Sequence, residues 1–164
     1  MHEARIAALQ GMPIFGGLRA EVLAALLEVA GTRAVPRDAF FFHEGDAADA
    51  LYVLERGEVA LLKRWAGEQY VLGRLRTGDC FGEMALLDLG PRSASVQAIE
   101  ACSALALSSA NLARLYETDV AQFALVQMNI ARELSRRLRA ADERLFRTRV
   151  GARHLEPEPG LLLT

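Results

Sequence analysis

The sequence predicts a mainly β fold, an eight-stranded antiparallel jelly-roll barrel with an N-terminal helix and two C-terminal helices, the last one long. Between residues 32 and 108, short runs rich in Val, Leu, Phe and Tyr are separated by Gly, Pro and Asp, which is typical of many short strands. These runs lie too close together for the crossover helices that a parallel sheet requires. On both sides of this region the apolar residues recur at three- and four-residue steps, which indicates helices.

The N-terminal helix is expected over residues 18–30. Its apolar stripe consists of Leu18, Val22, Leu23, Leu26, Leu27 and Ala30. Gly31 is expected to end this helix, because glycine is common just after a helical C-terminus. Before it, residues 6–14 are expected to form one or two helical turns, interrupted at Gly11 and Pro13.

Eight strands are expected within the central region. They are predicted at residues 33–35, 39–43, 50–55, 58–65, 69–75, 80–81, 93–99 and 104–108. Glycine marks the tight turns between several of them, because it adopts backbone angles that other residues avoid. These turns are expected at residues 43–46, 56–57, 66–68 and 77–79.

Two helices are expected after the last strand. Ser109 is a suitable cap for a short helix through Tyr116, and Thr118 or Asp119 for a longer helix that runs to about Phe146. The apolar face of the longer helix is expected to cover the barrel, to pair with a second copy, or to do both. That face consists of Val120, Phe123, Ala124, Val126, Gln127, Ile130, Ala131, Leu134, Leu138, Ala141 and Leu145. We therefore expect one domain over residues 1–150 and a flexible tail over 151–164. A homodimer formed through the 119–146 helix is one of the arrangements that this face allows.

Composition excludes several functional classes. The chain has 164 residues and a formal net charge of −2, so nothing in its overall charge favours nucleic acid or an anionic membrane as the main partner. No leader peptide or membrane span is expected, and the expected location is the cytoplasm. Cys80 and Cys102 are expected to be buried free thiols. The three histidines are scattered, so no metal site is expected and a metal-dependent enzyme is disfavoured.

The segment that carries chemistry spans residues 81–96. Here a strand end leads through Gly82 into a short helical turn at 83–87, and a loop at 88–91 leads to Arg92. The start of the helical turn offers unpaired N–H groups to a phosphate, and Arg92 offers a fork of donors to the same group. Glu83 repels a phosphate unless it accepts a hydrogen bond from a hydroxyl. A ribose with a free 2′-OH beside a phosphate satisfies both conditions.

Residues 82–87, with the sequence Gly-Glu-Met-Ala-Leu-Leu, and residues 92–94, Arg-Ser-Ala, resemble the phosphate-binding cassette of the cyclic nucleotide-binding domain family. Gly45-Asp46, Leu51-Tyr52-Val53 and Gly57-Glu58-Val59 extend the resemblance to the family's glycine-punctuated strands, so that it covers about residues 10–147. The resemblance implies a catabolite activator-like effector domain that holds the cyclic nucleotide inside an eight-stranded jelly roll.

The resemblance also implies a role for individual residues. Glu83 matches the acceptor for the ribose 2′-OH, and Arg92 matches the partner of the cyclic phosphate. Ser93 is expected to reach the phosphate or a guanine edge, and serine rather than threonine there favours cAMP over cGMP. The remaining implied ligand-binding residues are the cassette positions Gly82, Met84, Ala85 and Ala94 and the apolar wall residues Val71 and Leu72. On the long helix, Arg136, Arg137 and Leu138 are expected near the purine, although the family relative has small hydroxyl residues at the last two positions.

Other interpretations stay open. Taken singly, Glu83 is a helix-start charge, Arg92 a surface arginine, and Arg136 and Arg137 solvated helix residues. The alternative function is a regulatory or interaction module of the same fold that binds another effector or none. A hydrolytic enzyme is disfavoured, because no general base or metal accompanies Glu83 and Arg92. Direct DNA binding is also disfavoured, since about eighteen residues after Phe146 are too few for a helix-turn-helix domain, and the downstream partner stays unnamed.

The mechanistic hypothesis is a ligand-biased helix switch. The phosphate is expected to order residues 82–92, and Leu86 or Leu87 then repacks against the 110–116 helix. The long helix is expected to close over the purine or to change its pairing with a second chain. The ligand shifts this equilibrium only by its difference in affinity for the two states.

Overall fold

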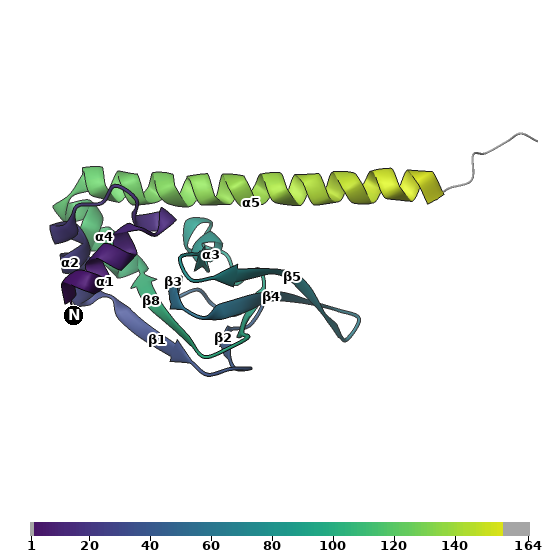
Figure 1. Ribbon diagram of the computed structural model, residues 1–164, viewed down its shortest axis with the longest axis horizontal. Coiled ribbons are helices and arrows are strands. Elements are labelled where there is room, and N and C mark those ends of the chain that lie inside the picture. Colours follow the sequence, from purple (N-terminus) through teal and green to yellow (C-terminus); the bar gives the residue numbers. More distant parts are fainter. Residues whose placement is uncertain (1, 156–164) are drawn as a thin grey trace, which may run out of the picture. The chain divides into compact units, whose positions relative to one another are not determined.

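The structure is a computed structural model that describes residues 2–155 (Figure 1). The chain forms two compact units, one that ends at Ile130 and one that begins at Ala131. The first unit contains all eight strands and the helices that surround them. The second is the C-terminal part of the last helix. None of the helices in the described range is long and apolar enough to cross a membrane.

The first unit is built on two four-stranded antiparallel sheets, which confirms the predicted fold class. One sheet has the order β1-β8-β3-β6 and the other the order β2-β7-β4-β5. The first sheet contains β1 (Gly31–Val35), β8 (Cys102–Ser108), β3 (Ala50–Arg56) and β6 (Cys80–Phe81). The second contains β2 (Phe40–Phe42), β7 (Ser95–Ala98), β4 (Glu58–Trp65) and β5 (Glu68–Arg76). Every strand overlaps a predicted run, because the glycine turns that divide the runs are present.

The core lies between the sheets and explains why these sequences form strands. Inward-facing residues alternate with outward-facing ones, as the burial of β7 and β8 shows. Apolar side chains from both sheets meet in one cluster, whose buried members include Phe41, Tyr52, Leu54, Val59, Phe81, Val96 and Ala104. Cys80 and Cys102 are buried and form no disulfide, as predicted. Burial raises the pKa of the Cys102 thiol, so the group stays protonated.

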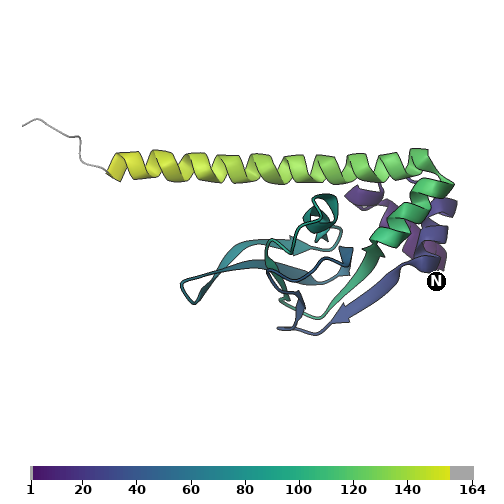
Figure 2. The same cartoon turned by 180° about the vertical axis from the view of Figure 1, so that it is seen from behind.

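The β4–β5 hairpin projects from the roll (Figures 1 and 2). Ala66 and Gly67 both have positive φ, of 52° and 83°, and they form its two-residue turn. Trp65 stands beside this turn with 76% of its surface exposed.

The N-terminal helices are α1 (His2–Gln10), the 3₁₀ turn η1 (Pro13–Phe15) and α2 (Ala20–Val29). They lie with α4 (Ser109–Thr118) at one end of the roll in both views (Figures 1 and 2). The helix ends at Val29, two residues before Gly31, the residue predicted to end it. Ala30 is the C-cap, with extended backbone angles, and Gly31 is the first residue of β1, so the chain passes directly from helix to strand.

The first C-terminal helix is capped one residue earlier than predicted, and the second extends beyond its predicted end. Ser108 rather than Ser109 caps α4, in a capping box with Asn111. The carboxylate of Asp119 accepts a hydrogen bond from the N–H of Gln122 at 3.1 Å and so caps α5 (Val120–Leu155). The helix continues nine residues past Phe146, so residues 151–155 of the predicted tail are helical. The rest of that tail, residues 156–164, lies outside the described residues.

Candidate functional site

The candidate site begins where β6 ends. Gly82 follows Phe81 with φ of 79°, in the left-handed region, and then α3 (Glu83–Leu87) begins at the predicted residues. A Cβ atom placed on Gly82 would lie 2.6 Å from Nη1 of Arg92. Both the backbone angle and this close approach require glycine. The backbone of Gly82 therefore packs directly against the guanidinium of Arg92.

The side chain of Arg92 is the centre of the site. It is only 1% exposed. Nη1 donates a hydrogen bond to the carbonyl of Gly82 at 2.9 Å, and Nη2 donates to the carbonyl of Ala50 at 2.7 Å. Nη2 also forms an ion pair with Oδ1 of Asp49 at 2.7 Å. The guanidinium thus joins the start of β3 to the start of α3.

Aromatic rings support this guanidinium. Its central carbon lies 4.0 Å from the ring centroid of Phe42 and 5.8 Å from that of Tyr52. Both distances are within the range of a cation–π interaction. The hydroxyl of Tyr52 accepts a hydrogen bond from Arg33 at 2.9 Å and donates one to Asp49 at 3.5 Å. Asp49 therefore contacts Arg92 directly and is linked to Arg33 only through the Tyr52 hydroxyl.

The backbone of Arg92 is fixed as well. Its N–H donates to the carbonyl of Asp46 at 2.8 Å, and its carbonyl accepts from the N–H of Gly45 at 2.9 Å. The Asp46 carboxylate in turn accepts from the N–H of His43 at 2.8 Å. The glycine turn at residues 43–46 thus holds the residue that carries the guanidinium.

One donor of Arg92 is not satisfied by the protein. Within residues 2–155, its buried Nε atom has no hydrogen-bond partner. Buried polar groups are nearly always hydrogen-bonded, so such a donor calls for an explanation. A planar guanidinium with a vacant Nε–H, stacked on an aromatic ring, is suited to a second anion besides Asp49.

Glu83 is also buried, with 2% exposure. It borders a cavity of about 280 Å³ behind α3, whose other walls come from β3, α4 and the first turns of α5. Leu86, Leu87, Leu112, Tyr116 and Phe123 are among its lining residues. Arg92 is not among them. Glu83 thus directly follows Gly82, the residue whose carbonyl binds Arg92, and the cavity that Glu83 borders is walled mainly by α3, α4 and α5.

The other predicted cassette residues lie nearby. The hydroxyl of Ser93 lies 4.0 Å from the sulfur of Met84, within hydrogen-bonding reach of it, and both side chains are exposed. Ala85 lies within α3, and Ala94 is half-buried just before β7. Val71 and Leu72 are exposed on β5, the edge strand of the second sheet.

The residues predicted near the purine belong to the second unit. Arg136 and Arg137 both donate to the carboxylate of Glu133, at 2.6 and 3.2 Å. Partial burial raises the pKa of Glu133, but the hydrogen bonds and charges of these two arginines outweigh that effect and lower it. Leu138 is exposed. A purine contact by any of the three stays a prediction.

Sequence reasoning missed three residues of this site, Phe42, Asp49 and Tyr52. Each is close in space to Arg92 but more than 30 positions away in the chain, and none forms a motif with it. One signal for Phe42 was available in the sequence, the run of three phenylalanines at residues 40–42. Successive side chains of a strand point to opposite faces, so a strand with one face in solvent is not expected to carry three in a row.

Residues 32–119 match the family described as "Cyclic nucleotide-binding domain". The chain belongs to this family. It is 38% identical over 135 residues to the "Cyclic AMP receptor protein" of Thermus thermophilus, a match that covers 82% of this chain and 61% of that protein.

Solved structures agree with this assignment. The crystal structure of the Thermus thermophilus catabolite activator protein superposes with a TM-score of 0.71 at 38% identity, over 81% of this chain and 61% of that one. A cyclic nucleotide-binding domain from Methylobacillus flagellatus superposes with a TM-score of 0.79 at 26% identity, over 90% and 83% of the two chains. The chain thus spans about three fifths of the length of its Thermus relative. The resemblance inferred from residues 82–94 is confirmed at the level of the family.

Proposed function

We propose that this domain binds a cyclic nucleoside monophosphate, cAMP in preference to cGMP, and acts as a ligand-responsive regulatory domain. In this proposal Arg92 binds the cyclic phosphate and Glu83 accepts a hydrogen bond from the ribose 2′-OH. The name of the Thermus relative, a cyclic AMP receptor, supports the choice of ligand. So does Ser93, which stands where the family associates threonine with cGMP.

The observation that carries the proposal is the buried Nε–H of Arg92, which has no hydrogen-bond partner within residues 2–155. Burial of a charged group is costly, and each donor left unpaired adds to that cost. A phosphate oxygen at Nε restores the missing hydrogen bond. A second oxygen of the same phosphate replaces the Asp49 carboxylate at Nη2, which is free to leave because its side chain is 73% exposed.

Glu83 supports the sugar part of the proposal. Its carboxylate is buried within the cassette, one residue after Gly82, whose carbonyl accepts from Arg92. A second anion this close to a phosphate is favourable only if a hydroxyl lies between them. The ribose of a 3′,5′-cyclic nucleotide has one such hydroxyl, at the 2′ position. Backbone groups of Gly82, Met84 and Ala85 would complete the contacts.

The regulatory step would use the cavity behind α3. Leu86 and Leu87 line that cavity together with Leu112 and Tyr116 of α4. When the phosphate orders residues 82–92, we expect Leu86 or Leu87 to move into this space. That movement would displace α4 and the first turns of α5. Ligand-dependent closing of α5 or pairing with a second copy through residues 119–146 would transmit the signal to a partner that stays unidentified.

The rest of the proposal concerns what the domain does not do. We propose no catalytic role for Glu83 or Arg92, and no cluster of metal-ligating side chains lies in the described part of the chain. We propose action in the cytoplasm and no direct contact of this domain with DNA. The Thermus relative is longer than this chain, so output through a further domain belongs to the proposal as well.

Calorimetric titration with cAMP and then with cGMP tests the proposal. We expect binding of both, tighter for cAMP, and a loss of ~2–5 kcal/mol of binding free energy in Arg92→Ala because the charge pair is desolvated. Arg37→Ala, which removes an exposed arginine between β1 and β2, is the matched control and should bind normally. Equal affinities of the Arg92→Ala and unaltered chains would contradict the assigned site.

The runner-up function is a module whose own carboxylate permanently fills the anion site. The ion pair between Arg92 and Asp49 favours it, because it occupies the guanidinium at 2.7 Å without a ligand. In that case neither nucleotide would release heat on titration. Because the Asp49 carboxylate would then be what blocks the site, Asp49→Asn should allow an anion to bind to Arg92.

A further inference from the structure

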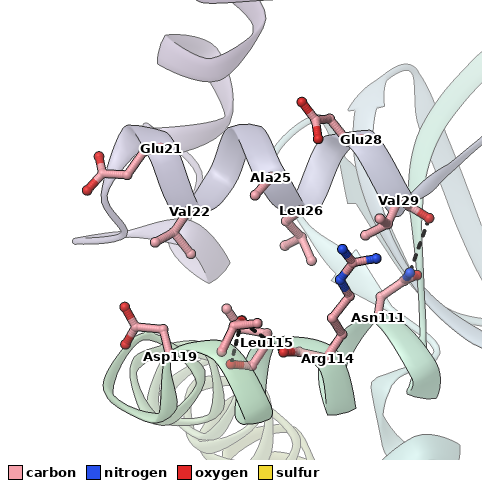
Figure 3. A pocket seen from close by; sticks show the side chains of 11 residues that line it. Glu21, Val22, Ala25, Leu26, Glu28, Val29, Asn111, Arg114, Leu115 and Asp119 are labelled. Carbon is pink, nitrogen blue, oxygen red and sulfur yellow. Dashed lines mark hydrogen bonds between the residues drawn. The ribbon is translucent and has the colours of Figure 1, made fainter.

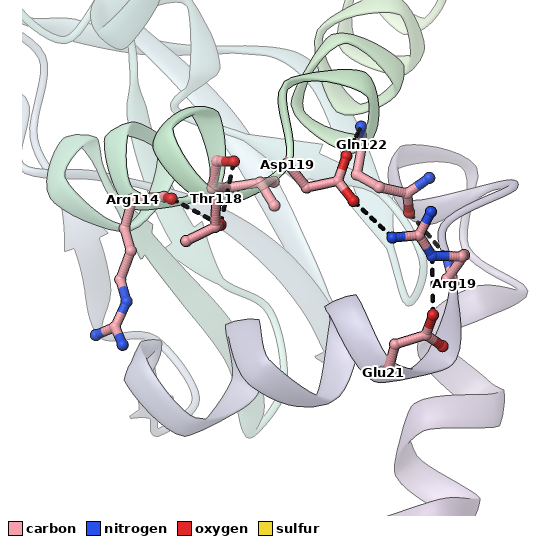
Figure 4. A network of polar contacts seen from close by, with 7 residues as sticks. Arg19, Glu21, Arg114, Thr118, Asp119 and Gln122 are labelled. Atoms are coloured by element: carbon pink, nitrogen blue, oxygen red, sulfur yellow. Dashed lines mark hydrogen bonds and ion pairs between the residues drawn. The ribbon is translucent and has the colours of Figure 1, made fainter.

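A groove lies between α2 and α4, on the helical end of the first unit and apart from the cassette. Its volume is about 290 Å³. At one end, the side-chain amide of Asn111 donates to the carbonyl of Val29 at 3.1 Å. At the other end, Arg19 forms an ion pair with Asp119 at 2.6 Å (Figure 4). The two helices are therefore antiparallel, and they are tied at both ends with a trough between them.

The floor of the trough is apolar. Val22 and Leu26 point from α2 toward Leu115 of α4 (Figure 3), and Ala25 lies between them on the same face. Ala25 is exposed, and its small side chain leaves the trough open. Residues spaced by three and four positions on two antiparallel helices offer a seat for a third helix. Since α2 has 10 residues, a partner helix of roughly three turns would match its length of about 15 Å.

The rim of the trough is acidic. Its lining residues include the carboxylates of Glu21, Glu28 and Asp119 but only one cation, Arg114. Arg19 binds Glu21 and Asp119 from outside the trough. Glu28 forms no ion pair within residues 2–155 and is exposed, as is Glu21. Glu21 and Glu28 thus lie seven positions apart on the same edge of α2, beside the apolar floor.

We propose that this groove is a docking site for a short basic amphipathic helix of a partner protein. The partner's apolar residues would lie on Val22, Leu26 and Leu115, and its basic residues would face Glu21 and Glu28. This is the helix-in-groove mode of recognition, in which apolar side chains supply affinity and rim charges set orientation and association rate.

The test uses a synthetic fluorescein-labelled peptide of about 14 residues, with leucines at three- and four-residue steps and arginines along one flank. Fluorescence anisotropy measures its binding to the full chain. We expect saturable binding that weakens about three- to tenfold in the double variant Glu21→Gln/Glu28→Gln. Ala25→Trp fills the trough and should weaken binding at least tenfold. Circular dichroism confirms that each variant is folded.

Two controls make the test specific. Glu117→Gln removes an exposed carboxylate of α4 that does not line the groove, and it should leave the affinity unchanged. A peptide with glutamates in place of its arginines should bind at least tenfold more weakly. No binding of the basic peptide, or equal binding by the Ala25→Trp chain, would overturn the proposal. The proposal would also be overturned if light scattering showed that the unaltered chain is an oligomer and that Ala25→Trp dissociates it. A second copy of the chain would then be the occupant of the groove.

Discussion

Two arginine–carboxylate pairs of nearly equal length hold two different regions of this molecule. Arg92 binds Asp49 at 2.7 Å inside the cassette, and Arg19 binds Asp119 at 2.6 Å where α2 meets the first turn of α5. The side chain of Arg92 is 1% exposed, whereas that of Arg19 is 53% exposed. Distance alone therefore does not determine how much an ion pair contributes to stability. Burial determines how far the free energy of unfolding falls when one partner of the pair is removed.

Arg92→Ala should produce the largest effect on folding. The carbonyls of Gly82 and Ala50 lose their donor, and a buried space opens beside Phe42. We expect the free energy of unfolding to fall by ~2–4 kcal/mol, measured by urea denaturation. Arg19→Ala serves as the exposed counterpart and should cost far less. Equal losses in the two variants would contradict the distinction drawn from burial.

Gly82→Ala should rank second. The new Cβ meets Nη1 of Arg92 at 2.6 Å, and the backbone angle of 79° disfavours any residue with a side chain. We expect a loss of ~1–3 kcal/mol of stability and weaker nucleotide binding. Gly73→Ala is the matched control, because a Cβ there has no neighbour within 4 Å. Its thermal midpoint should stay close to that of the unaltered chain.

Asp49→Asn tests whether Asp49 competes with the ligand for Arg92 or holds Arg92 in position. The substitution keeps a hydrogen-bond acceptor near Arg92 but removes the charge that competes with a phosphate. We expect cAMP to bind roughly two- to fivefold tighter, a modest gain because the Asp49 side chain is largely exposed. Calorimetry measures the gain. A loss of affinity would show that Asp49 helps to position Arg92 instead of competing for it.

The exposed pair should produce the smallest effect, and it should depend on pH. The N–H of Gln122, which donates to the carboxylate, and the Arg19 guanidinium lower the pKa of Asp119 despite some desolvation. A carboxylate with a lowered folded-state pKa stabilises the protein above the ordinary aspartate pKa, and this contribution is lost as pH falls through the folded value. Asp119→Asn should therefore differ from the unaltered chain near pH 6, and the two should converge at acid pH. Denaturation curves at several pH values measure this convergence.

The sequence was informative where function depends on neighbours in the chain. Gly82, Glu83 and Arg92 lie within eleven positions, so their spacing alone indicated an anion site, and the glycine turns indicated the strands. The partners of Arg92 could not be found in this way. Phe42, Asp49 and Ala50 reach it only because β2 and β3 fold against the cassette, and no local preference encodes that contact.

Helix ends were predicted less well for a different reason. Ser108 and Ser109 are equally good caps by residue type, and the Asn111 side chain decides between them by closing a capping box on Ser108. The end of α5 was placed too early because the apolar stripe stops near Leu145. Polar helical residues and ion pairs such as Arg147 with Glu143 continue the helix without that stripe.

The projecting hairpin has a practical consequence for every measurement described above. Trp65 is the one tryptophan in the sequence, and most of its indole already faces water in the folded protein. Its emission should therefore change little when the roll unfolds, so intrinsic fluorescence is a poor monitor of denaturation here. The same residue should report sensitively on any molecule that covers the hairpin, since contact would shift its emission to shorter wavelength.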